Sequence, residues 1–413
     1  MPSEQLLAKY ADVAVGLGLG IEPGDRLIVE MDSPAMTDFA RLIADSAYAA
    51  GAENVDVIWL DSHLVRSRFT HGGDAAAEAV TGHSKLLKVA ADTGDFKLRL
   101  GAPDPGLLAG VDPAKVSRFD RINRDHAQEY QHMALSFRLH WCMLGVPTPE
   151  WATAVFPDLD VDQAVEALWD AVLRACRIDA DDPVAAWGEH NARLRERAEQ
   201  LTAKQFASLR YQGPGTDLKL GLPENHVWLG GEAKSALGRA FNPNLPTEEV
   251  FTAPHRLQGD GMVTSTKPLI LNGVTIEKFT FEVRKGKVEK ASATSGQDML
   301  EQVLQQDDGA AHFGEVALVP QSSAVANENL VWRHPLFDEN DASHIAFGKA
   351  FPVAITDGDD MTPDELSDAG LNDSSTHIDF VVGSKDLAVL GVNQDGSEEA
   401  LLEDGEWAIT LED

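Results

Sequence analysis

A strand, a helix and a second strand follow one another near the start of this chain. The largely apolar run Arg26–Met31 comes after the turn Pro23-Gly24-Asp25 and predicts a buried strand. Residues 38–50 have the periodicity of an amphipathic helix that stops at Gly51, and residues 55–60 predict the next strand. Strands joined in this way lie parallel in one sheet. The chain is therefore expected to begin with an α/β domain that contains a parallel sheet.

The pattern changes in the middle of the chain. Helical periodicity dominates residues 113–206, most clearly at 162–175 and 185–201. We place the domain boundary near residue 205. The first domain, residues 1–205, is then an N-terminal α/β domain with a helical arm.

After Gly213-Pro214-Gly215, short apolar strands alternate with turns. Asn272-Gly273 and Lys285-Gly286 are dipeptides typical of hairpin turns. The expected strands lie at residues 218–220, 226–229, 269–271, 275–283 and 287–293. Residues 206–413 are accordingly predicted to form an α+β domain with a substantial antiparallel sheet.

The charge of the chain excludes some classes of partner. Its 34 Lys and Arg stand against 67 Asp and Glu, and no basic cluster is visible, so neither nucleic acid nor an anionic membrane is an expected partner. Cys142 and Cys176 are too few for a disulfide framework or a cysteine-based zinc site. No basic leader precedes an apolar run, and no apolar stretch approaches the roughly 20 residues that span a bilayer. A cytoplasmic protein is expected.

His377 and Asp379 are the first candidates for a functional site. They are separated by one residue in a segment rich in β-branched and aromatic residues, 376–383, which is typical of a strand. Alternate residues of a strand point to the same face, so the two side chains can hold one metal ion while Ile378 and Phe380 face the core. Taken alone, such a pair more often makes only a hydrogen bond.

Three further segments supply candidate ligands: Glu249 in Leu245–Phe251, Glu315 in Phe313–Leu318 and His344 in Ser343–Gly348. Glu315 adjoins an apolar run, where burying a carboxylate without a partner is costly and a cation removes the cost. Glu249 has an ordinary alternative as a solvated surface acid. His344 follows residues 338–341, which have the composition of a helix N-terminus, so it has an alternative as a histidine on the face of a helix.

In this order and at this spacing, the segments resemble the metallo-aminopeptidases of the aminopeptidase T and aminopeptidase S family. The likeness extends to Tyr10-Ala11, Gly24-Asp25, Ala47–Ala52, Asp182–Trp187 and Gly215–Leu218, and so covers nearly the whole chain. In the resemblance, five residues fall on the metal-ligand positions of the family: Glu249, Glu315, His344, His377 and Asp379.

The resemblance implies a metal-dependent aminopeptidase that removes N-terminal residues from short peptides by two-metal hydrolysis, in a homodimer. Oxygen and nitrogen ligands without thiolate suit zinc, cobalt or manganese as the two divalent ions. A general base must also take a proton from the attacking water. Glu248 is the nearest uncommitted carboxylate, although strand alternation would point it away from Glu249.

One position departs from the family pattern. Seven residues after His344 the family carries a tyrosine thought to stabilise the oxyanion, whereas this chain has Phe351, which cannot donate a hydrogen bond. Three outcomes remain open: another donor such as His255 substitutes, the enzyme is slow on ordinary peptides, or the chemistry has drifted.

Two other functions are consistent with part of the pattern. His344, His377 and Asp379 alone form the two-histidine, one-carboxylate set of mononuclear Fe(II) oxygenases, and ring-opening dioxygenases of hydroxypyridines are related to the peptidase family. Glu249 and Glu315 argue against this alternative, because a single-iron site does not need two more carboxylates. The third function is a binding protein that keeps the metal but has lost turnover through Phe351.

Overall fold

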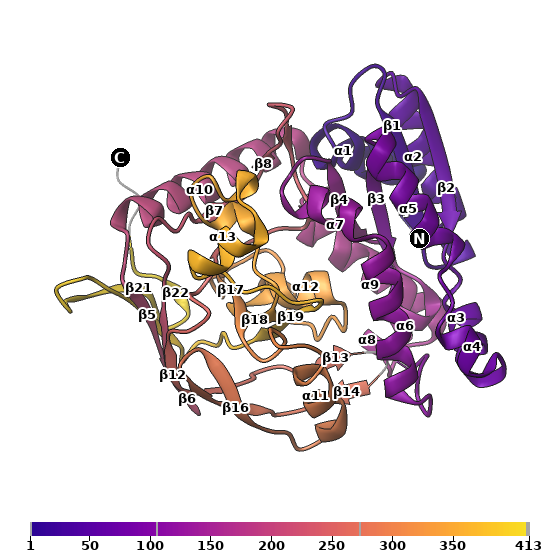
Figure 1. Cartoon of the computed structure of the whole chain (residues 1–413). Helices are drawn as coiled ribbons and strands as arrows, with labels where there is room; N and C mark the ends of the chain where they lie inside the picture. Colours follow the sequence, from indigo (N-terminus) through magenta and orange to yellow (C-terminus); the bar gives the residue numbers. More distant parts are fainter. Residues whose placement is uncertain (1, 105, 272–273, 410–413) are drawn as a thin grey trace. The chain divides into compact units, whose positions relative to one another are not determined.

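The computed structural model of the chain describes residues 2–104, 106–271 and 274–409 (Figure 1). The chain forms two compact units, each built from several segments. Unit 1 comprises residues 1–191, 232–247 and 330–337, and unit 2 comprises residues 192–231, 248–329 and 338–413. The boundary near residue 205 remains a prediction. Among the described residues, no helix is long and apolar enough to cross a membrane.

Unit 1 contains a parallel sheet, as the sequence predicts. Its five strands have the order β10-β4-β3-β1-β2, and every neighbouring pair is parallel. The strands are β1 (Arg26–Met31), β2 (Asn54–Trp59), β3 (Phe96–Gly101), β4 (Trp141–Gly145) and β10 (Asn244–Leu245). Because they are parallel, their carboxyl ends meet at one edge of the sheet, where ligands bind in many folds of this kind.

The helices of unit 1 are α1 (Glu4–Val13), α2 (Thr37–Ala49), α3 (Ser62–His71), α4 (Gly73–Ala77), α5 (Gly82–Thr93), α6 (Pro113–His126), α7 (Gln128–Leu135), α8 (Pro149–Val155), α9 (Val161–Ala175) and the first part of α10 (Pro183–Lys204). Helices pack around the parallel sheet, among them α2 and α5 (Figure 1). Ile28 of β1 shares a core cluster with Leu87 of α5 and Tyr130 of α7. Tyr10 of α1 contacts Phe39 of α2, with ring centroids 5.3 Å apart. These contacts bury the apolar faces that the helical periodicity marks. The remaining strands of unit 1 form the hairpin of β8 (Ala233–Lys234) and β9 (Ala240–Phe241).

The two large sheets of unit 2 are antiparallel, which confirms an antiparallel character for the second half of the chain. The five-stranded sheet has the order β19-β18-β17-β11-β7, with β7 (Leu229–Gly230), β11 (Val250–Thr252), β17 (Phe313–Leu318), β18 (His344–Gly348) and β19 (His377–Val381). The eight-stranded sheet has the order β16-β15-β12-β6-β5-β20-β21-β22. Its strands are β5 (Ser208–Gly213), β6 (Thr216–Gly221), β12 (Gly259–Thr264), β15 (Thr280–Arg284), β16 (Lys287–Ser292), β20 (Ala388–Val392), β21 (Glu398–Glu403) and β22 (Glu406–Trp407).

An aromatic core joins these two sheets. Phe281 of β15 lies 5.3 Å from Phe380 of β19 and 5.8 Å from Phe347 of β18, measured between ring centroids. Offset and edge-to-face pairs of this kind stabilise beyond the area they bury. Phe380 faces this core and Ile378 packs against it, as the strand pattern predicts. The other elements of unit 2 are the hairpin β13 (Leu269–Leu271) and β14 (Val274–Ile276) and the helices α11 (Gln297–Leu304), α12 (Pro335–Asp341, partly in unit 1) and α13 (Pro363–Asp368).

Several predicted elements differ from the structure. The strand expected at 275–283 is interrupted, because β14 ends at Ile276 and Lys278 adopts a φ of 46° before β15 begins. Strand β4 lies inside the stretch that was expected to be helical. The turn at Lys285-Gly286 is confirmed, since it joins β15 to β16, whereas Asn272-Gly273 lies outside the described residues.

Candidate metal centre

The five-stranded sheet of unit 2 carries all five predicted metal ligands on or beside neighbouring strands. Glu249 directly precedes β11, Glu315 lies on β17, His344 begins β18, and β19 carries His377 and Asp379. The small residue Ala346 of β18 pairs with Glu315 on one side and with Asp379 on the other. Ala346 therefore separates the two carboxylates without filling the space between them.

Alternation along the strands separates this site from the core. Ile345 and Phe347 of β18 belong to the hydrophobic core of unit 2. His344 and Ala346, the residues between and beside them, consequently point to the opposite face of the sheet. The same rule places His377 and Asp379 opposite Phe380. The apolar side chains of one face thus hold the ligands of the other in position.

Strand β17 reaches this arrangement only through a bulge. Phe313 and Val316 both belong to the core, although residues three apart face opposite sides in a regular strand. The register with β18 shifts between Phe313 and Glu315, and this shift turns Glu315 away from the core. A Cβ atom at Gly314 would lie 2.4 Å from the carbonyl oxygen of Lys349, so the bulge requires glycine.

The ligand atoms converge. His344 Nε2 lies 3.0 Å from Glu249 Oε2, 3.4 Å from Glu315 Oε1 and 3.9 Å from Asp379 Oδ1. His377 Nε2 lies 3.7 Å from Glu315 Oε2 and 3.5 Å from Asp379 Oδ2. The atoms form two groups, each within 4.8 Å: one of Glu249, Glu315 and His344, and one of Glu315, His377 and Asp379. Glu315 belongs to both.

Each histidine is oriented by its other ring nitrogen. His377 Nδ1 lies 2.7 Å from the carbonyl oxygen of Lys349, and His344 Nδ1 lies 3.3 Å from that of Ala342. A carbonyl only accepts, so Nδ1–H donates in both cases and Nε2 of the neutral ring is left to bind a metal. His344 is 1% exposed and His377 is 27% exposed, so the site opens to solvent on the His377 side.

The residues fit a cation. Glu249 Oε2 and Asp379 Oδ1 are buried and make no hydrogen bond among the described residues. His344 Nε2 lies 3.0 Å from Glu249 Oε2 but outside hydrogen-bond geometry. A buried carboxylate oxygen without a donor is costly, and a divalent ion removes the cost. Oxygen and nitrogen donors without thiolate are the set that suits zinc, cobalt or manganese.

The pKa values describe how the chain balances these charges by itself. Burial raises the pKa of Glu315 to about 7, and the charges of Asp379 and Glu249 add to this shift. Burial alone would lower the pKa of His377, but Asp379 and Glu315 raise it to about 9. The site therefore holds protons where a metal ion would otherwise supply positive charge.

Glu339 is a further acid of this site, and the sequence interpretation missed it. Burial raises the pKa of Glu339 well above its usual value, and the charges of Asp379 and Glu249 raise it further. Its carboxyl group therefore lies in the electrostatic field of the metal ligands. The helix start expected at residues 338–341 is wrong, because α12 begins at Pro335 and ends at Asp341.

His344 begins strand β18. The alternative interpretation of His344 as a histidine on the face of a helix is therefore wrong. Pro335 was the available signal for the helix start, since proline favours the first turn. Asp338 and Glu339 resembled an N-terminal first turn because acids are favoured there. Asp338 does lie in the first turn of α12, but that turn begins at Pro335, three residues earlier than the acids suggested.

Glu248, the predicted general base, is 4% exposed, and its backbone N–H donates to Asn340 Oδ1 at 2.7 Å. It lies outside both ligand groups of the described chain. The objection from strand alternation does not apply, because β11 begins only at Val250. Its catalytic role remains a prediction.

Phe351 lies beside the predicted ligands. Its ring centroid is 5.3 Å from that of His377, with the rings nearly perpendicular, and 5.6 Å from that of Phe251. Tyr211, the one tyrosine in the sequence of unit 2, is buried in the core and cannot replace the missing hydroxyl. His255 Nδ1 accepts the N–H of Leu257 at 3.2 Å. That His255 donates a hydrogen bond to the oxyanion in place of the tyrosine remains a prediction.

The family model of the thermophilic metalloproteases (M29) matches residues 3–407. The chain belongs to the thermophilic metalloprotease family. It is 42% identical over 409 residues to aminopeptidase 2 of Geobacillus stearothermophilus, covering 99% of each chain. It also matches the solved structure of wild-type AmpT from Thermus thermophilus with a TM-score of 0.90 and 36% identity, covering 98% of this chain and 100% of AmpT. The predicted family and its metallo-aminopeptidase function are thereby confirmed.

A distant likeness bears on the oxygenase alternative. The structure of 2,5-dihydroxypyridine dioxygenase from Pseudomonas putida matches this thermophilic metalloprotease with a TM-score of 0.53 and 11% identity, over 99% of each chain. At that identity the likeness shows a shared fold alone.

Proposed function

We propose that this thermophilic metalloprotease removes N-terminal residues from short peptides with the help of two divalent cations. The five predicted ligands would hold them: Glu249, Glu315, His344, His377 and Asp379. One observation carries the proposal, namely that Glu315 directs Oε1 toward His344 and Oε2 toward His377. A carboxylate with its two oxygens in different ligand groups is suited to bridging a pair of ions.

The ligands divide between the two ions. Glu249 and His344 would complete one coordination sphere and His377 with Asp379 the other. When bound, a pair of divalent ions lowers the pKa of a coordinated water and polarises the scissile carbonyl. The more exposed His377 side is where a substrate would approach.

Proton transfer is assigned to carboxylates of the chain. A general base must take the proton of the attacking water and pass it to the leaving amine. We assign this role to Glu248, a buried acid adjacent in sequence to Glu249. Glu339 is a candidate for the second transfer only: its raised pKa favours a proton on its carboxyl group near the same ligands, and a protonated acid can donate to the leaving amine.

Phe351 gives this site an apolar wall. Its ring lies beside the imidazole of His377 and packs on its other neighbour, Phe251, and neither phenylalanine can donate a hydrogen bond to an oxyanion. We therefore propose a slower reaction on ordinary peptides than a tyrosine at this position would allow. A homodimer belongs to the same proposal on the resemblance to the family. Zinc, cobalt or manganese as the ions follows from the oxygen and nitrogen donors, and a cytoplasmic location from the sequence.

The test is to reload the metal-free protein separately with zinc, cobalt and manganese. Two ions per chain and hydrolysis of dipeptides and of an aminoacyl arylamide are the expected results. His377→Ala should lose metal and activity while keeping its far-UV spectrum, and His71→Ala, which changes an exposed histidine of α3, serves as the matched control. One iron per chain together with oxygen uptake would instead establish the oxygenase alternative.

A further inference from the structure

Unit 1 has a pocket of its own at the carboxyl ends of its parallel strands. The pocket has a volume of about 180 Å³, and its lining includes Asp32, Trp59, Asp61, His63, Asp104 and Glu150. Asp32 directly follows β1, while Asp61 and Asp104 lie in the loops after β2 and β3. This is the edge of a parallel sheet at which ligands are bound in doubly wound folds. None of these residues belongs to the metal centre.

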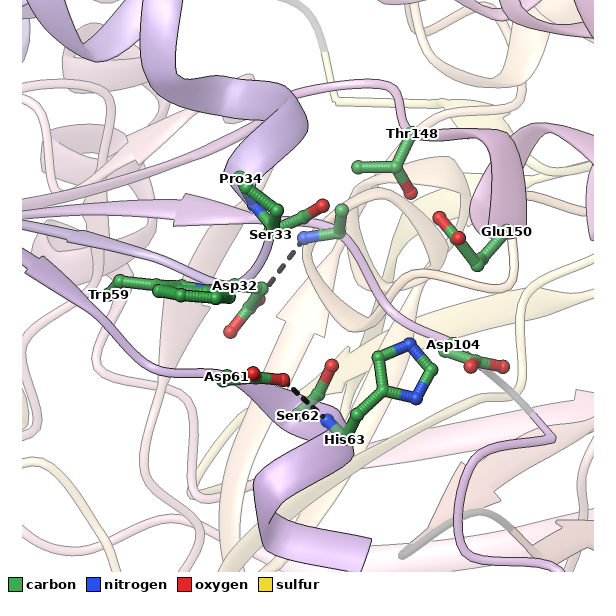
Figure 2. A pocket seen from close by; sticks show the side chains of 11 residues that line it. Asp32, Ser33, Pro34, Trp59, Asp61, Ser62, His63, Asp104, Thr148 and Glu150 are labelled. Atoms are coloured by element: carbon green, nitrogen blue, oxygen red, sulfur yellow. Dashed lines mark hydrogen bonds between the residues drawn. The ribbon is translucent and has the colours of Figure 1, made fainter.

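The acids of the pocket keep acceptor atoms available. Asp61 uses Oδ1 to accept the backbone N–H groups of His63 and Leu64, and Asp104 uses Oδ1 for that of Gly106. The second oxygen of each is left for a ligand. The Glu150 side chain makes no hydrogen bond or ion pair with any described residue, although it lines the pocket. Figure 2 shows Glu150 and Thr148 across the pocket from Asp61 and Ser62.

Asp32 differs from the other acids. Its carboxylate pairs with the guanidinium of Arg99 and accepts the backbone N–H of Ala102 at 3.2 Å. Its charge is therefore balanced within the chain. Asp61, Asp104 and Glu150 have no such partner in the lining, which contains neither lysine nor arginine. The pocket consequently favours a cationic ligand over an anionic one.

The spacing of these acids distinguishes an organic cation from a metal ion. Within the described chain, groups of three ligands within 4.8 Å occur only at the metal centre of unit 2, and the pocket acids form none. A metal ion needs its ligands gathered around one point, whereas a guanidinium or an alkylammonium can contact carboxylates spread around a cavity. Trp59 is 50% exposed and offers the aromatic surface on which such cations stack.

We propose that this pocket binds a guanidinium or primary ammonium group on a short alkyl chain, held by Asp61, Asp104 and Glu150 beside Trp59. The chemistry is shared by the side chain of a basic peptide residue and by a free alkylamine. The proposal concerns unit 1 alone and does not depend on turnover at the metal centre.

A matched pair of small molecules tests the charge requirement. Butylguanidinium and butylurea have nearly the same shape, but only the first is charged. Calorimetric titration of the full-length protein should show saturable binding of butylguanidinium, at least about tenfold tighter than that of butylurea. Equal affinities, or no saturable binding of either, would overturn the proposal.

Variants locate the site. Glu150→Gln and Trp59→Leu should each weaken the binding of butylguanidinium about fivefold. Glu129→Gln is the matched control, because Glu129 is likewise an exposed acid in the first turn of a unit 1 helix. An equal loss in Glu129→Gln would mean that only the general negative charge attracts the cation, and would refute the site.

The two sources of the cation can be separated in the same assay. An N-acetylated Ala-Arg amide has no free amino terminus for an aminopeptidase. Tighter binding of this peptide than of butylguanidinium assigns the pocket to basic side chains of peptides. Equal binding of the two assigns it to free cations. The metal content of Glu150→Gln should equal that of the unaltered protein, which keeps this result separate from the test of the hydrolase.

Discussion

The two acidic regions of the molecule differ in how closely their carboxylates approach one another. In unit 2, Glu249, Glu315 and Asp379 lie close together with two histidines. Some of their carboxylate oxygens are buried without a hydrogen-bond donor. In unit 1, Asp61, Asp104 and Glu150 surround a cavity without forming any group of three. Water can solvate the second arrangement but not the first, and charge that water cannot reach must be balanced locally.

The comparison shows why acid content alone is a poor guide to a metal site. The same residue types occur in both regions, and the difference lies in backbone placement. Four paired strands and a bulge bring the acids of unit 2 to one point. The acids of unit 1 follow separate strands and stay apart.

The largest effect is expected for Glu315→Ala. This variant removes the one carboxylate shared by both ligand groups, so it should lose both ions and reduce kcat by about 1000-fold or more. Metal analysis and hydrolysis of an aminoacyl arylamide measure the two losses. Asp104→Ala, which removes an acid from the dispersed set, should keep its metal. Retention of both ions by Glu315→Ala would contradict the bridging role.

Phe351→Tyr should raise kcat on ordinary peptides about tenfold or more, because it places a donor beside His377. Phe251→Tyr changes the neighbouring ring of the pair and serves as the control. The comparison of kcat between the two variants is the measurement. An unchanged rate in Phe351→Tyr would mean that another group already stabilises the oxyanion.

Metal binding should release protons near neutral pH. The pKa of His377 is about 9 and that of Glu315 about 7 before metal binds, so both carry protons that a cation displaces. Titration of zinc into the metal-free protein, in buffers of different ionisation enthalpy, counts the protons released.

Glu30 of β1 is a buried acid whose negative charge is balanced by neighbouring basic side chains of unit 1. Burial alone would raise its pKa, but Lys97, His83 and Arg99 lower it to about 2 from a usual value of 4.5. Its contribution to the free energy of unfolding is therefore complete above about pH 4.5 and is lost as the pH falls through about 2.

Glu30→Gln should accordingly destabilise unit 1 by about 3 kcal/mol near neutral pH. The difference from the unaltered protein should shrink toward zero near pH 2. Denaturant unfolding followed at several pH values measures both quantities. Glu53→Gln, at an exposed acid whose ion pair with Arg26 spans 3.9 Å, should change little. A pH-independent loss in Glu30→Gln would indicate packing and not charge.

The regular parts of the fold could be predicted from the sequence. The strand Arg26–Met31 matches β1, and the helix expected at 38–50 matches α2 to within one residue at each end, because periodicity reports burial directly. The His377 and Asp379 pair follows the same rule. Glu315 does not, since the bulge at Gly314 breaks the alternation on which such predictions rest.

Glu339 illustrates what local pattern cannot supply. Glu339 lies near Asp379 and Glu249 only in the folded chain, because these residues are far apart in the sequence. Strand β10 is similar, because two residues at 244–245 become a strand only by pairing with β4. Both features are set by tertiary placement, which single-sequence periodicity does not encode.

The interleaving of the two units limits how this enzyme can be divided. The chain passes between them after residues 191, 231, 247, 329 and 337. A fragment that starts at residue 206 would lack Leu194 and Leu201, which belong to the core of unit 2. Recombination at any single point would thus divide at least one of the two units. Point substitutions could change the pocket of unit 1 during evolution. A single insertion or exchange of contiguous sequence could not replace the whole unit, because it is built from three separate segments.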